Sequence, residues 1–445
     1  MMPWPVQLAQ DFDAFGPLPI TSVDKAPSSV AEVIGGYMGV FFIAYFVAFF
    51  FTPLMRVLAV RNGIIDWPDL KRKNHIEPIA YLGGVGIFLG WLVAVMLSYV
   101  VTPAPSLHGQ HALFPLSIIF GAAVICLTGL FDDVWGISPR VKVGGQLLAA
   151  AAIASQKVGD IIVSDFLSLA GLPHEVAWLN YILGTAVIAI FIVGACNAVN
   201  LLDGLDGLAS GVTGICCTGF LILASLVALQ YTDLGPQDGF YSHVRLVMCL
   251  AIVGAILGFL PYNFNPANIF MGDAGSLLLG YLAAVSMLLF AHVPTTSLKY
   301  VTACIIIFAL PITDTALAIF RRKLRGQPIF HPDNQHIHHL LRRSGLTVRQ
   351  SVLALYAISA GFTVVGCVMV GLDFQWRYML AVFFVLFGFV IVTAYKIGHR
   401  MVLAEQAATA AAAIAPDPVA SEPRSNAAPP AAPPPPQPVT PVHSA

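Results

Sequence analysis

Long apolar stretches with almost no charged side chain limit what this chain of 445 residues can fold into. A run of eighteen or more apolar residues is long enough to cross the hydrocarbon core of a bilayer as a helix. Hydrophobic residues make up 58% of the sequence and charged residues 10%, whereas a soluble domain carries about 25% charged residues. The sequence therefore predicts a polytopic membrane protein and excludes the soluble, disordered, collagen-like and disulfide-scaffold classes.

We predict an all-α fold with about eleven transmembrane helices. The predicted spans are 35–60, 82–101, 113–131, 143–156, 179–196, 208–229, 245–260, 276–291, 300–320, 352–370 and 378–397. Three regions follow, namely an extracytoplasmic N-terminal segment (1–34), a transmembrane catalytic domain (35–400) and a disordered, Ala/Pro-rich cytoplasmic tail (401–445). Such a tail cannot bury enough apolar surface to offset the entropy lost on ordering.

Net charge and cysteine content add two expectations. The formal net charge is −1, so no nucleic-acid partner is expected. The seven cysteines lie in or beside apolar runs and form no CxxC pair, which predicts free thiols packed among helices.

Lysine and arginine set the expected orientation, because they concentrate in cytoplasmic connections. With the N-terminus outside, 17 of the 22 lysines and arginines lie on the inner side and five on the outer side. All the connections rich in Asp, Asn and His then also lie inside. The sequence therefore predicts one acidic, amide and imidazole site at the cytoplasmic face.

Three acidic motifs belong to this predicted site. Asp132 and Asp133 follow the third span, where they either hold a divalent cation or cap a helix end by pairing with Arg140 or Lys142. Asp273 lies between two glycines at the start of the eighth span, where it either holds a hard cation or caps the helix. A further run comprises Asn197, Asn200, Asp203 and Asp206, which recur every three residues. They lie close to one face if the segment is helical, and the alternative is an ordinary polar loop.

Two basic motifs complete it. His336, His338 and His339 follow an arginine-rich stretch, which favours phosphate recognition over a zinc site or a plain polar loop. Lys71, Arg72 and His75 follow the first span, where they hold either lipid head groups or a lipid phosphate at the active site.

Taken in order, these motifs resemble those of the polyprenyl-phosphate N-acetylhexosamine-1-phosphate transferases, glycosyltransferase family 4. The resemblance covers residues 35–400, and its elements are Asp-x-Pro-x-x-x-Arg-Lys-x-His, Asp132-Asp133, Asn-x-x-Asn-x-x-Asp-Gly-x-Asp-Gly-Leu-Ala, Phe-Met-Gly-Asp-x-Gly-Ser and His-Ile-His-His. The histidine motif resembles the undecaprenyl-phosphate GlcNAc-1-phosphate transferase branch more than the phospho-MurNAc-pentapeptide transferase branch, which stays the alternative.

The resemblance implies an enzyme of the bacterial inner membrane that starts cell-wall, O-antigen or lipopolysaccharide synthesis. It would transfer a sugar phosphate from a UDP-N-acetylhexosamine, most simply UDP-GlcNAc, to undecaprenyl phosphate. The implied cofactor is Mg²⁺, for which Mn²⁺ is an expected substitute. A homodimer is a further expectation. The implied catalytic residues are Asp132, Asp133, Asp203 and Asp206, and the implied metal ligands are Asp273 and Asp206. The implied substrate-binding residues are Lys71, Arg72, His75, Asn197, Asn200, Asn268, His336, His338 and His339.

Two other classes use similar residues. A lipid transporter or flippase would carry ionisable residues at mid-membrane, whereas Asp314 is the main one in the predicted spans. A CDP-alcohol phosphotransferase would carry an arginine soon after Asp206-Gly207, and none follows.

The predicted orientation is testable by cysteine labelling. A single cysteine placed at position 71, 265 or 338 should react with an impermeant maleimide only after the inner face is exposed. Labelling of position 338 from outside intact cells would contradict the orientation.

Overall fold

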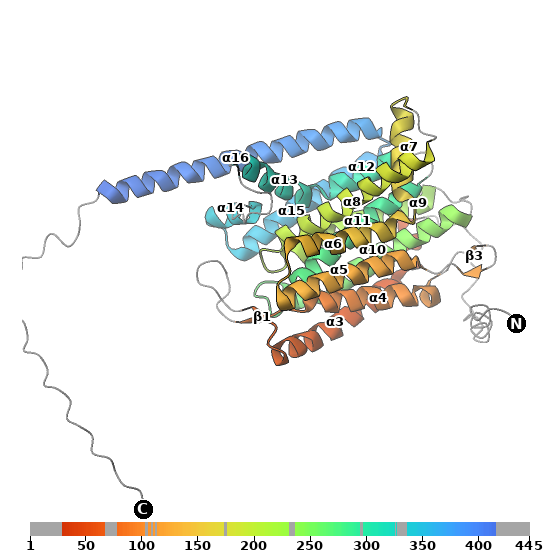
Figure 1. Cartoon of the computed structure of the whole chain (residues 1–445), viewed down its shortest axis with the longest axis horizontal. Helices are drawn as coiled ribbons and strands as arrows, with labels where there is room; N and C mark the ends of the chain where they lie inside the picture. The colour runs from red at the N-terminus through yellow and green to blue at the C-terminus, as the bar shows by residue number, and fades with distance from the viewer. Residues whose placement is uncertain are drawn as a thin grey trace, which may run out of the picture. The chain divides into compact units, whose positions relative to one another are not determined.

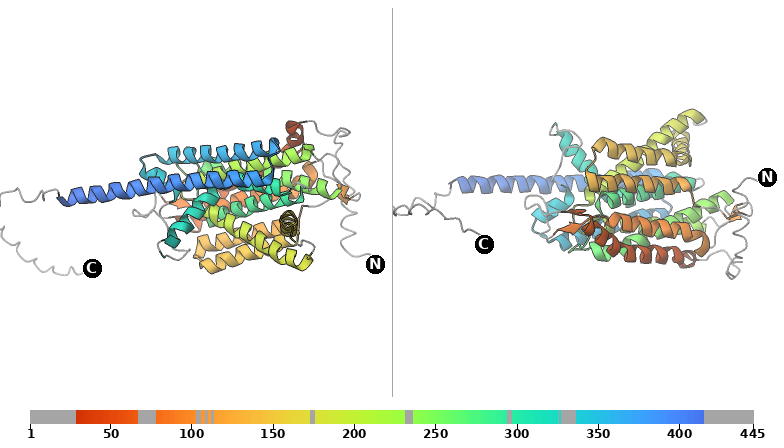
Figure 2. Two further views of the ribbon diagram at one scale, coloured as in Figure 1. Left: turned by 90° about the horizontal axis from the view of Figure 1, so that it is seen from above. Right: turned by 60° about the horizontal axis from the view of Figure 1, so that its bottom comes forward.

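A computed structural model of the chain describes residues 29–66, 78–102, 106–107, 110–111, 114–172, 176–230, 236–293, 297–324, 326 and 336–414. The described residues up to Tyr395 form one compact unit, and the described residues from Lys396 belong to a second. The first unit is a bundle of helices that run side by side (Figures 1 and 2). Its helices are α2 (Val30–Gly35), α3 (Met38–Arg61), α4 (Gly83–Val101), α5 (Leu116–Trp135), α6 (Pro139–Ala154), α7 (Val158–Leu169), α8 (Ala177–Leu202), α9 (Leu208–Gln230), α10 (Pro236–Asn263), α11 (Gly272–Leu288), η1 (Leu289–His292), α12 (Ser297–Ile307), α13 (Ala309–Leu324), α14 (Ile337–Arg343), α15 (Val348–Gly371) and the start of α16 (Trp376–Ile414).

Two short antiparallel pairs accompany the helices. β1 (Ile65–Asp66) pairs with β2 (Ile79–Ala80), and β3 (Ser106–Leu107) pairs with β4 (Gln110–His111). Ala80 also forms a parallel bridge with Ile269, which brings the segment before α4 against the segment before α11.

The described helices confirm the all-α membrane fold. Nine of them are long and apolar enough to cross a bilayer, and the number reaches 11 if each of two bent pairs is one span. The bent pairs are α6 with α7, at 74°, and α12 with α13, at 68°. Each predicted span coincides with one of these helices or pairs. The prediction missed α2, α7 and α14, because none of them is long enough to form an apolar run of spanning length.

The tail prediction is wrong in part. α16 continues to Ile414, so residues 401–414 are helical rather than disordered. The cause is the alanine-rich sequence 407–413, since alanine has the highest helix propensity of all residues. Residues 415–445 and 1–28 lie outside the described residues.

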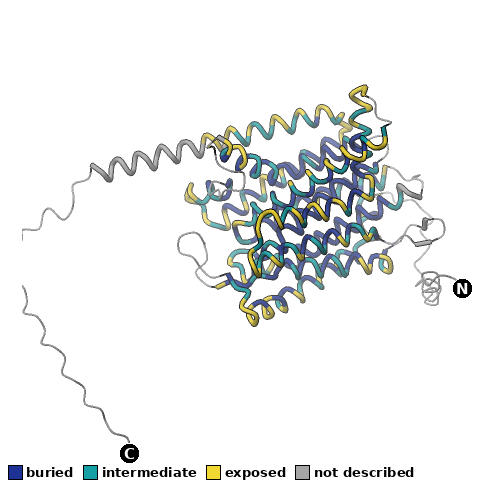
Figure 3. The backbone as a smooth tube through the Cα atoms, viewed as in Figure 1, coloured by how far each residue is buried: buried dark blue, intermediate teal, exposed yellow. Residues whose placement is uncertain are grey.

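The centre of the bundle is α11. All residues of an 18-residue window within its spanning segment Gly272–His292 are buried, compared with 28% of the window in α3 and 6% in the first part of α16. It packs against α4, α5, α8 and α9, and buried backbone fills the middle of the bundle in Figure 3. The helix that carries Asp273 is therefore enclosed by protein, and its N-terminal end is held by its neighbours.

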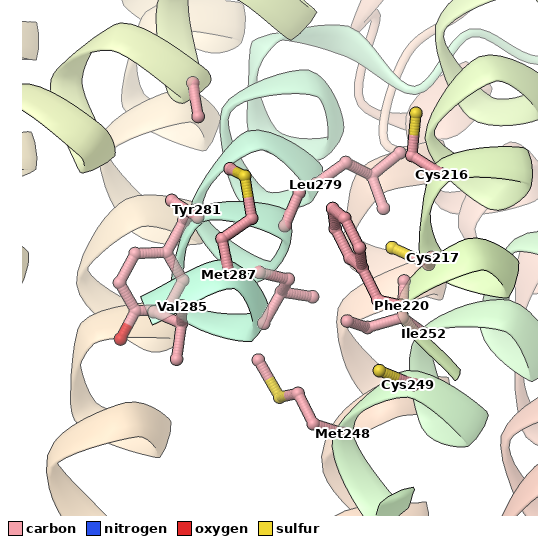
Figure 4. Close-up of a cluster of buried hydrophobic side chains, with 14 of the residues drawn as sticks. Cys216, Cys217, Phe220, Met248, Cys249, Ile252, Leu279, Tyr281, Val285 and Met287 are labelled. Atoms are coloured by element: carbon pink, nitrogen blue, oxygen red, sulfur yellow. The ribbon is translucent and has the colours of Figure 1, made fainter. Parts of the chain in front are cut away.

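The cysteines pack as the sequence predicts. All seven are free, and Cys216, Cys217 and Cys249 are fully buried or nearly so between α9 and α10. Figure 4 shows them beside Phe220 and Met248, facing side chains of α11. These thiols fill space in the apolar core.

Small residues let two helices approach the first turn of α11. A Cβ atom added to Gly84 of α4 would lie 2.1 Å from the backbone nitrogen of Gly275, and one added to Gly129 of α5 would lie 2.4 Å from that of Ala274. Backbone at these crossings cannot move aside as a flexible side chain could, so the two glycines set the position of α11.

We predict that Gly84→Ala lowers stability by about 1–3 kcal/mol, because the added methyl group overlaps backbone at a packed crossing. Thermal unfolding of the detergent-solubilised protein measures the change. Gly361→Ala on α15 is the matched control, since a Cβ there meets nothing within 4 Å. Equal melting temperatures for the two variants would contradict the close crossing.

Candidate active site

Four helix ends bring most of the predicted polar motifs to one cavity of about 380 Å³. α5, α8 and α10 end beside it, and α11 begins there. Its lining residues are Asp66, Tyr81, Asn200, Asp203, Gly204, Leu205, Asp206, Asn263, Asn265, Phe270, Gly272, Asp273, His339 and Val348. Residues more than 250 positions apart in the sequence thus line one cavity. This agrees with the prediction that the motifs share a site, which was made because their connections lie on one side of the membrane.

Asp133 holds the beginning of α11. Its two carboxylate oxygens accept hydrogen bonds from the backbone N–H groups of Asp273 (2.7 Å) and Ala274 (3.0 Å). The first N–H groups of a helix have no partner within the helix, and an anion there is stabilised by the helix dipole. Gly272 precedes them with φ +66°, and a Cβ at this glycine would lie 2.4 Å from Asp133 Oδ2. Asp133 therefore positions Asp273.

Lys142 of α6 links Asp132, in the same motif as Asp133, to Asp273. Its ammonium group lies 2.6 Å from Asp132 Oδ2 and 2.5 Å from Asp273 Oδ2. All three side chains are a quarter exposed or less, so solvent screens the interaction only in part. The pairing of Asp132 with Lys142, one of the two alternatives for this motif, is thus observed. The same lysine also contacts the predicted metal ligand.

Asn200 provides the second side-chain hydrogen bond to Asp273. Its side-chain amide donates to Asp273 Oδ1 at 2.8 Å and also lies 2.9 Å from Ser276 Oγ. Asp273 therefore receives hydrogen bonds on both oxygens, from Lys142 on one and from Asn200 on the other. These contacts fix a partly buried carboxylate at the cavity wall.

Asp206 lies in the turn between α8 and α9, against the segment after α10. Its Oδ2 accepts hydrogen bonds from the Asn265 amide (2.8 Å) and the backbone N–H of Ala267 (3.0 Å). The amide oxygen of Asn263 accepts from Gly207 N–H (3.2 Å) and from Ser210 Oγ (3.1 Å). Two asparagines thus fix the turn that carries Asp203 and Asp206.

Negative charge is concentrated around Asp203. Burial and the nearby carboxylates of Asp273, Asp133 and Asp206 together raise its pKa to about 8. One lysine, Lys142, lies among these acids. A cation bound in the cavity would favour the ionised form of Asp203 and relieve this repulsion.

The segment around β1 and β2 adds Asp66, the first residue of the predicted basic motif, and Tyr81, which the sequence did not indicate. Tyr81 hydrogen-bonds to Asp66, and burial together with this carboxylate raises the pKa of the tyrosine. The backbone that carries Tyr81 is fixed to the site, since Phe270 N–H donates to Ala80 O at 2.9 Å and Gly83 N–H donates to Phe270 O at 3.0 Å. Lys71, Arg72 and His75, predicted in the same segment, lie outside the described residues.

The three histidines take different positions. His339 lines the cavity, whereas His336 and His338 are buried behind it, with 5% and 2% of their surfaces exposed. A Cβ at Gly204 would lie 2.4 Å from His338 Nε2, so the absence of a side chain at position 204 lets the imidazole pack against this turn. Burial and the neighbouring histidines lower the pKa of His338 to about 3, so its ring is neutral.

Besides His336 and His338, two further predicted substrate-binding residues do not line the cavity. Asn197 lies one turn earlier on α8 than Asn200 and faces α6, where its amide donates to Gln146 Oε1 at 3.0 Å. Asn268 is exposed, and its backbone oxygen accepts from Arg56 Nε at 3.1 Å. The three-residue spacing predicted Asn197 on the same helix face as Asn200. In the structure the side chain of Asn197 contacts α6 instead of the cavity.

The predicted site residues did not include Lys142, Asn263 or Asn265, although Lys142 was one of the two pairing alternatives for the Asp132 motif. Lys142 lies three residues inside α6 and Asn263 at the last position of α10. The sequence could have indicated these residues by their position, because each is a polar residue close to a predicted helix end. That position does not reveal which carboxylate the residue contacts.

A larger cavity, of about 640 Å³, lies at the other ends of α6 and α8. Asp160 and Asp165 of α7 line it together with the stacked rings of Tyr241 and His292. It contains none of the motif residues. Size alone therefore does not identify the active site, and we place the chemistry in the smaller, more acidic cavity.

No group of three or more His, Cys, Asp or Glu side chains within the described ranges is arranged closely enough to hold a metal ion by itself. The carboxylates of Asp203, Asp206 and Asp273 nevertheless line one cavity, and oxygen ligands of this kind suit Mg²⁺. Mg²⁺ commonly keeps water molecules and shares its ligands with substrate phosphates, so a complete protein cage is not required.

Comparison with known proteins decides the family. The model of "Glycosyl transferase family 4" matches residues 115–291. A Bacillus subtilis (strain 168) protein named probable undecaprenyl-phosphate N-acetylglucosaminyl 1-phosphate transferase is 35% identical over 331 residues, which are 74% of this chain and 84% of the relative. The chain belongs to glycosyl transferase family 4.

Other relatives within family 4 carry related names. A decaprenyl-phosphate N-acetylglucosaminephosphotransferase of Mycolicibacterium smegmatis (strain ATCC 700084 / mc(2)155) is 32% identical over 70% of this chain and 77% of its own. An undecaprenyl-phosphate alpha-N-acetylglucosaminyl 1-phosphate transferase of Escherichia coli (strain K12) is 29% identical over 79% of this chain and 91% of its own. The family match begins at the start of α5 and ends in η1, so it contains Asp132, Asp203, Asp206 and Asp273.

We predict that Lys142→Gln lowers turnover at least about a hundredfold, because Asp132 and Asp273 then repel each other without a cation between them. Initial rates of the purified variant measure the loss. Arg140→Gln, an exposed position two residues earlier, is the control and should keep near-normal turnover. Equal rates for the two variants would show that Lys142 is only a surface charge.

Proposed function

We propose that this family 4 protein transfers GlcNAc-1-phosphate from UDP-GlcNAc to undecaprenyl phosphate and releases UMP. The observation that carries the proposal is the meeting of Asp203, Asp206, Asp273 and His339 in one cavity at the helix ends, in a chain whose relatives bear such names. The product, a lipid-linked sugar diphosphate, would start the synthesis of an envelope glycan. The phospho-MurNAc-pentapeptide transferase alternative loses support, because these three relatives are named as N-acetylglucosamine transferases.

In the proposed reaction, an oxygen of the lipid phosphate attacks the phosphorus that bears the sugar. The bond between the two phosphates of UDP-GlcNAc breaks, and UMP leaves with the bonding electrons. A phosphate monoester has a second pKa of about 6, so its attacking oxygen is mostly ionised at pH 7. A general base then contributes little. Positioning and charge neutralisation should dominate, as is usual for phosphoryl transfer.

The hydrogen bonds of Asp133 agree with a positioning role rather than with that of a general base. Both of its oxygens already accept backbone N–H groups of α11, and Asp132 is paired with Lys142. We therefore propose that Asp133 positions Asp273 and that Asp132 positions Lys142, rather than that either removes a proton from the lipid. Asn200 would hold Asp273 from the other side.

We further propose Mg²⁺ as the cofactor, with Mn²⁺ as a substitute. Asp273 and Asp206 would supply carboxylate oxygens to it, with Asp203 beside them. The bound cation would neutralise charge on the diphosphate as the bond between its phosphates breaks. The crowding of carboxylates around Asp203 supports a cation in this cavity.

The proposed location is the bacterial inner membrane, with the cavity at the cytoplasmic face. The nucleotide sugar comes from the cytoplasm and the lipid phosphate from the bilayer, so their reaction requires a site at that interface. The excess of lysine and arginine in the connections at this end supports the orientation. The proposal leaves monomer and homodimer open, and the mass of the solubilised particle distinguishes them.

The decisive experiment supplies the purified protein with radiolabelled UDP-GlcNAc, UDP-GalNAc or UDP-MurNAc-pentapeptide, each with undecaprenyl or decaprenyl phosphate. We expect label from UDP-GlcNAc to enter the lipid phase with equal release of UMP. Release of UDP, or label that stays in the aqueous phase with every acceptor, would refute the phosphotransferase proposal. Preference for decaprenyl phosphate would correct the acceptor alone.

We predict that Asp273→Asn lowers turnover at least a hundredfold, about 3 kcal/mol of lost transition-state stabilisation, because the variant loses the charge that binds Mg²⁺. Rates over a range of Mg²⁺ concentrations measure it. Asp373→Asn, an exposed carboxylate paired with Lys299, is the control. Near-normal turnover of Asp273→Asn at saturating Mg²⁺ would make Asp273 a helix cap only.

A further inference from the structure

Asp314 is an ionisable side chain inside a membrane-spanning pair of helices. It lies on α13, five residues after the beginning of this helix, and its side chain is 1% exposed. A charged group at such depth is costly and is kept only with partners, so its partners indicate its role. A transporter would direct such a group toward a path across the membrane. Here it is directed toward the start of α14.

Both oxygens of Asp314 bind the start of α14. Asp314 Oδ2 lies 2.8 Å from His336 Nδ1, and Asp314 Oδ1 accepts the backbone N–H of Ile337 at 2.8 Å. His336 is itself buried, with 5% of its surface exposed. The carboxylate thus fixes the first residues of α14 to α13.

This contact also determines which ring nitrogen of His336 carries the proton. An ionised carboxylate only accepts hydrogen bonds, so Nδ1 of His336 carries the proton that is donated to Asp314. In the neutral ring, Nε2 is then the acceptor. A neutral amide at position 314 could donate to Nδ1 instead and would favour the opposite tautomer.

Stacked imidazoles connect this contact to the cavity. The rings of His336 and His338 are parallel within 3°, with centroids 5.7 Å apart, and His338 packs against Gly204. The ring of His339 lies 4.2 Å from that of His338 and lines the cavity. α14 is therefore held between Asp314 on one side and the turn of Asp203 and Asp206 on the other.

We infer that Asp314 is a positioning residue for the transfer reaction, which acts through His336 by fixing α14 so that His339 faces the diphosphate-binding carboxylates. The inference rests on the proposed function. It explains why a carboxylate is kept inside the membrane part of the chain, and it adds a residue from outside the five sequence motifs. Asp314 itself does not line the cavity.

Steady-state kinetics with each substrate varied test this role. Asp314→Asn keeps the shape of the side chain and removes its charge, and we expect kcat/KM for UDP-GlcNAc to fall about 10- to 100-fold, as for other residues that orient a histidine. KM for undecaprenyl phosphate should stay within about threefold of the wild-type value. That KM reports binding of the acceptor lipid, which does not depend on the position of His339. Thr313→Val is the matched control, since Thr313 is a buried neighbour whose hydroxyl donates to Ala309 O at 2.7 Å within the helix.

A double-mutant cycle separates positioning from general damage. If Asp314 acts through His336, adding Asp314→Asn to His336→Gln should cost little further activity, because residues that act as a unit are not additive. Losses that multiply, an unchanged kcat/KM in Asp314→Asn, or a loss confined to the lipid acceptor would each overturn the inference.

Hydrogen exchange gives a readout that does not depend on activity. In Asp314→Ala the backbone amides of 337–340 should exchange faster than in the wild type, whereas Thr313→Val should leave them unchanged. Unchanged exchange in Asp314→Ala would overturn the link between Asp314 and α14. If the wild type lacks transferase activity but the exchange result holds, the proposed function fails and the contact stands.

Discussion

The hydrogen bonds from the first turn of α11 to the Asp133 carboxylate are the contact on which the candidate site depends. α11 is enclosed along its length, so its first N–H groups need partners within the protein. Asp133 supplies them from the end of α5 and thereby fixes both the depth and the direction of α11. Gly272 allows the close approach, because its positive φ and missing Cβ leave room for the carboxylate.

Electrostatics explains why so many acids can share this small volume. Lys142 neutralises part of the charge of Asp132 and Asp273, and amides of Asn200 and Asn265 donate to Asp273 and Asp206. The charge that stays uncompensated around Asp203 favours cationic ligands. In the proposed reaction the substrates add phosphate charge, so a metal ion and substrate phosphates would balance each other in the cavity.

The sequence predicted the spans because bilayer thickness imposes a minimum length on apolar runs, and α3, α8 and α9 show this directly. It also predicted that Asp203, Asp206 and Asp273 share a site, because their connections share one side. It could not predict side-chain direction. Asn197 turns to Gln146 and Asn200 to Asp273, although they lie one helical turn apart.

Long-range pairing was equally beyond the sequence. The contacts of Lys142 with Asp273 and of Asp314 with His336 depend on how α6 meets α11 and how α13 meets α14. Apolar periodicity says which face of a helix is buried, and it does not say which helix lies opposite. The 74° bend between α6 and α7 likewise follows from packing that no local propensity reveals.

The burial of α11 has a consequence for how this protein responds to its surroundings. In the spanning windows of α3 and of the first part of α16 few residues are buried, so these helices are the ones that can contact lipid, whereas every residue in the window of α11 is buried. A change of bilayer thickness or detergent therefore reaches Asp273 only through neighbouring helices, and chiefly where backbone touches backbone at Gly84 and Gly129. The acidic centre is insulated from the fluidity of the membrane, while the acceptor lipid must still arrive through the surrounding, lipid-exposed helices.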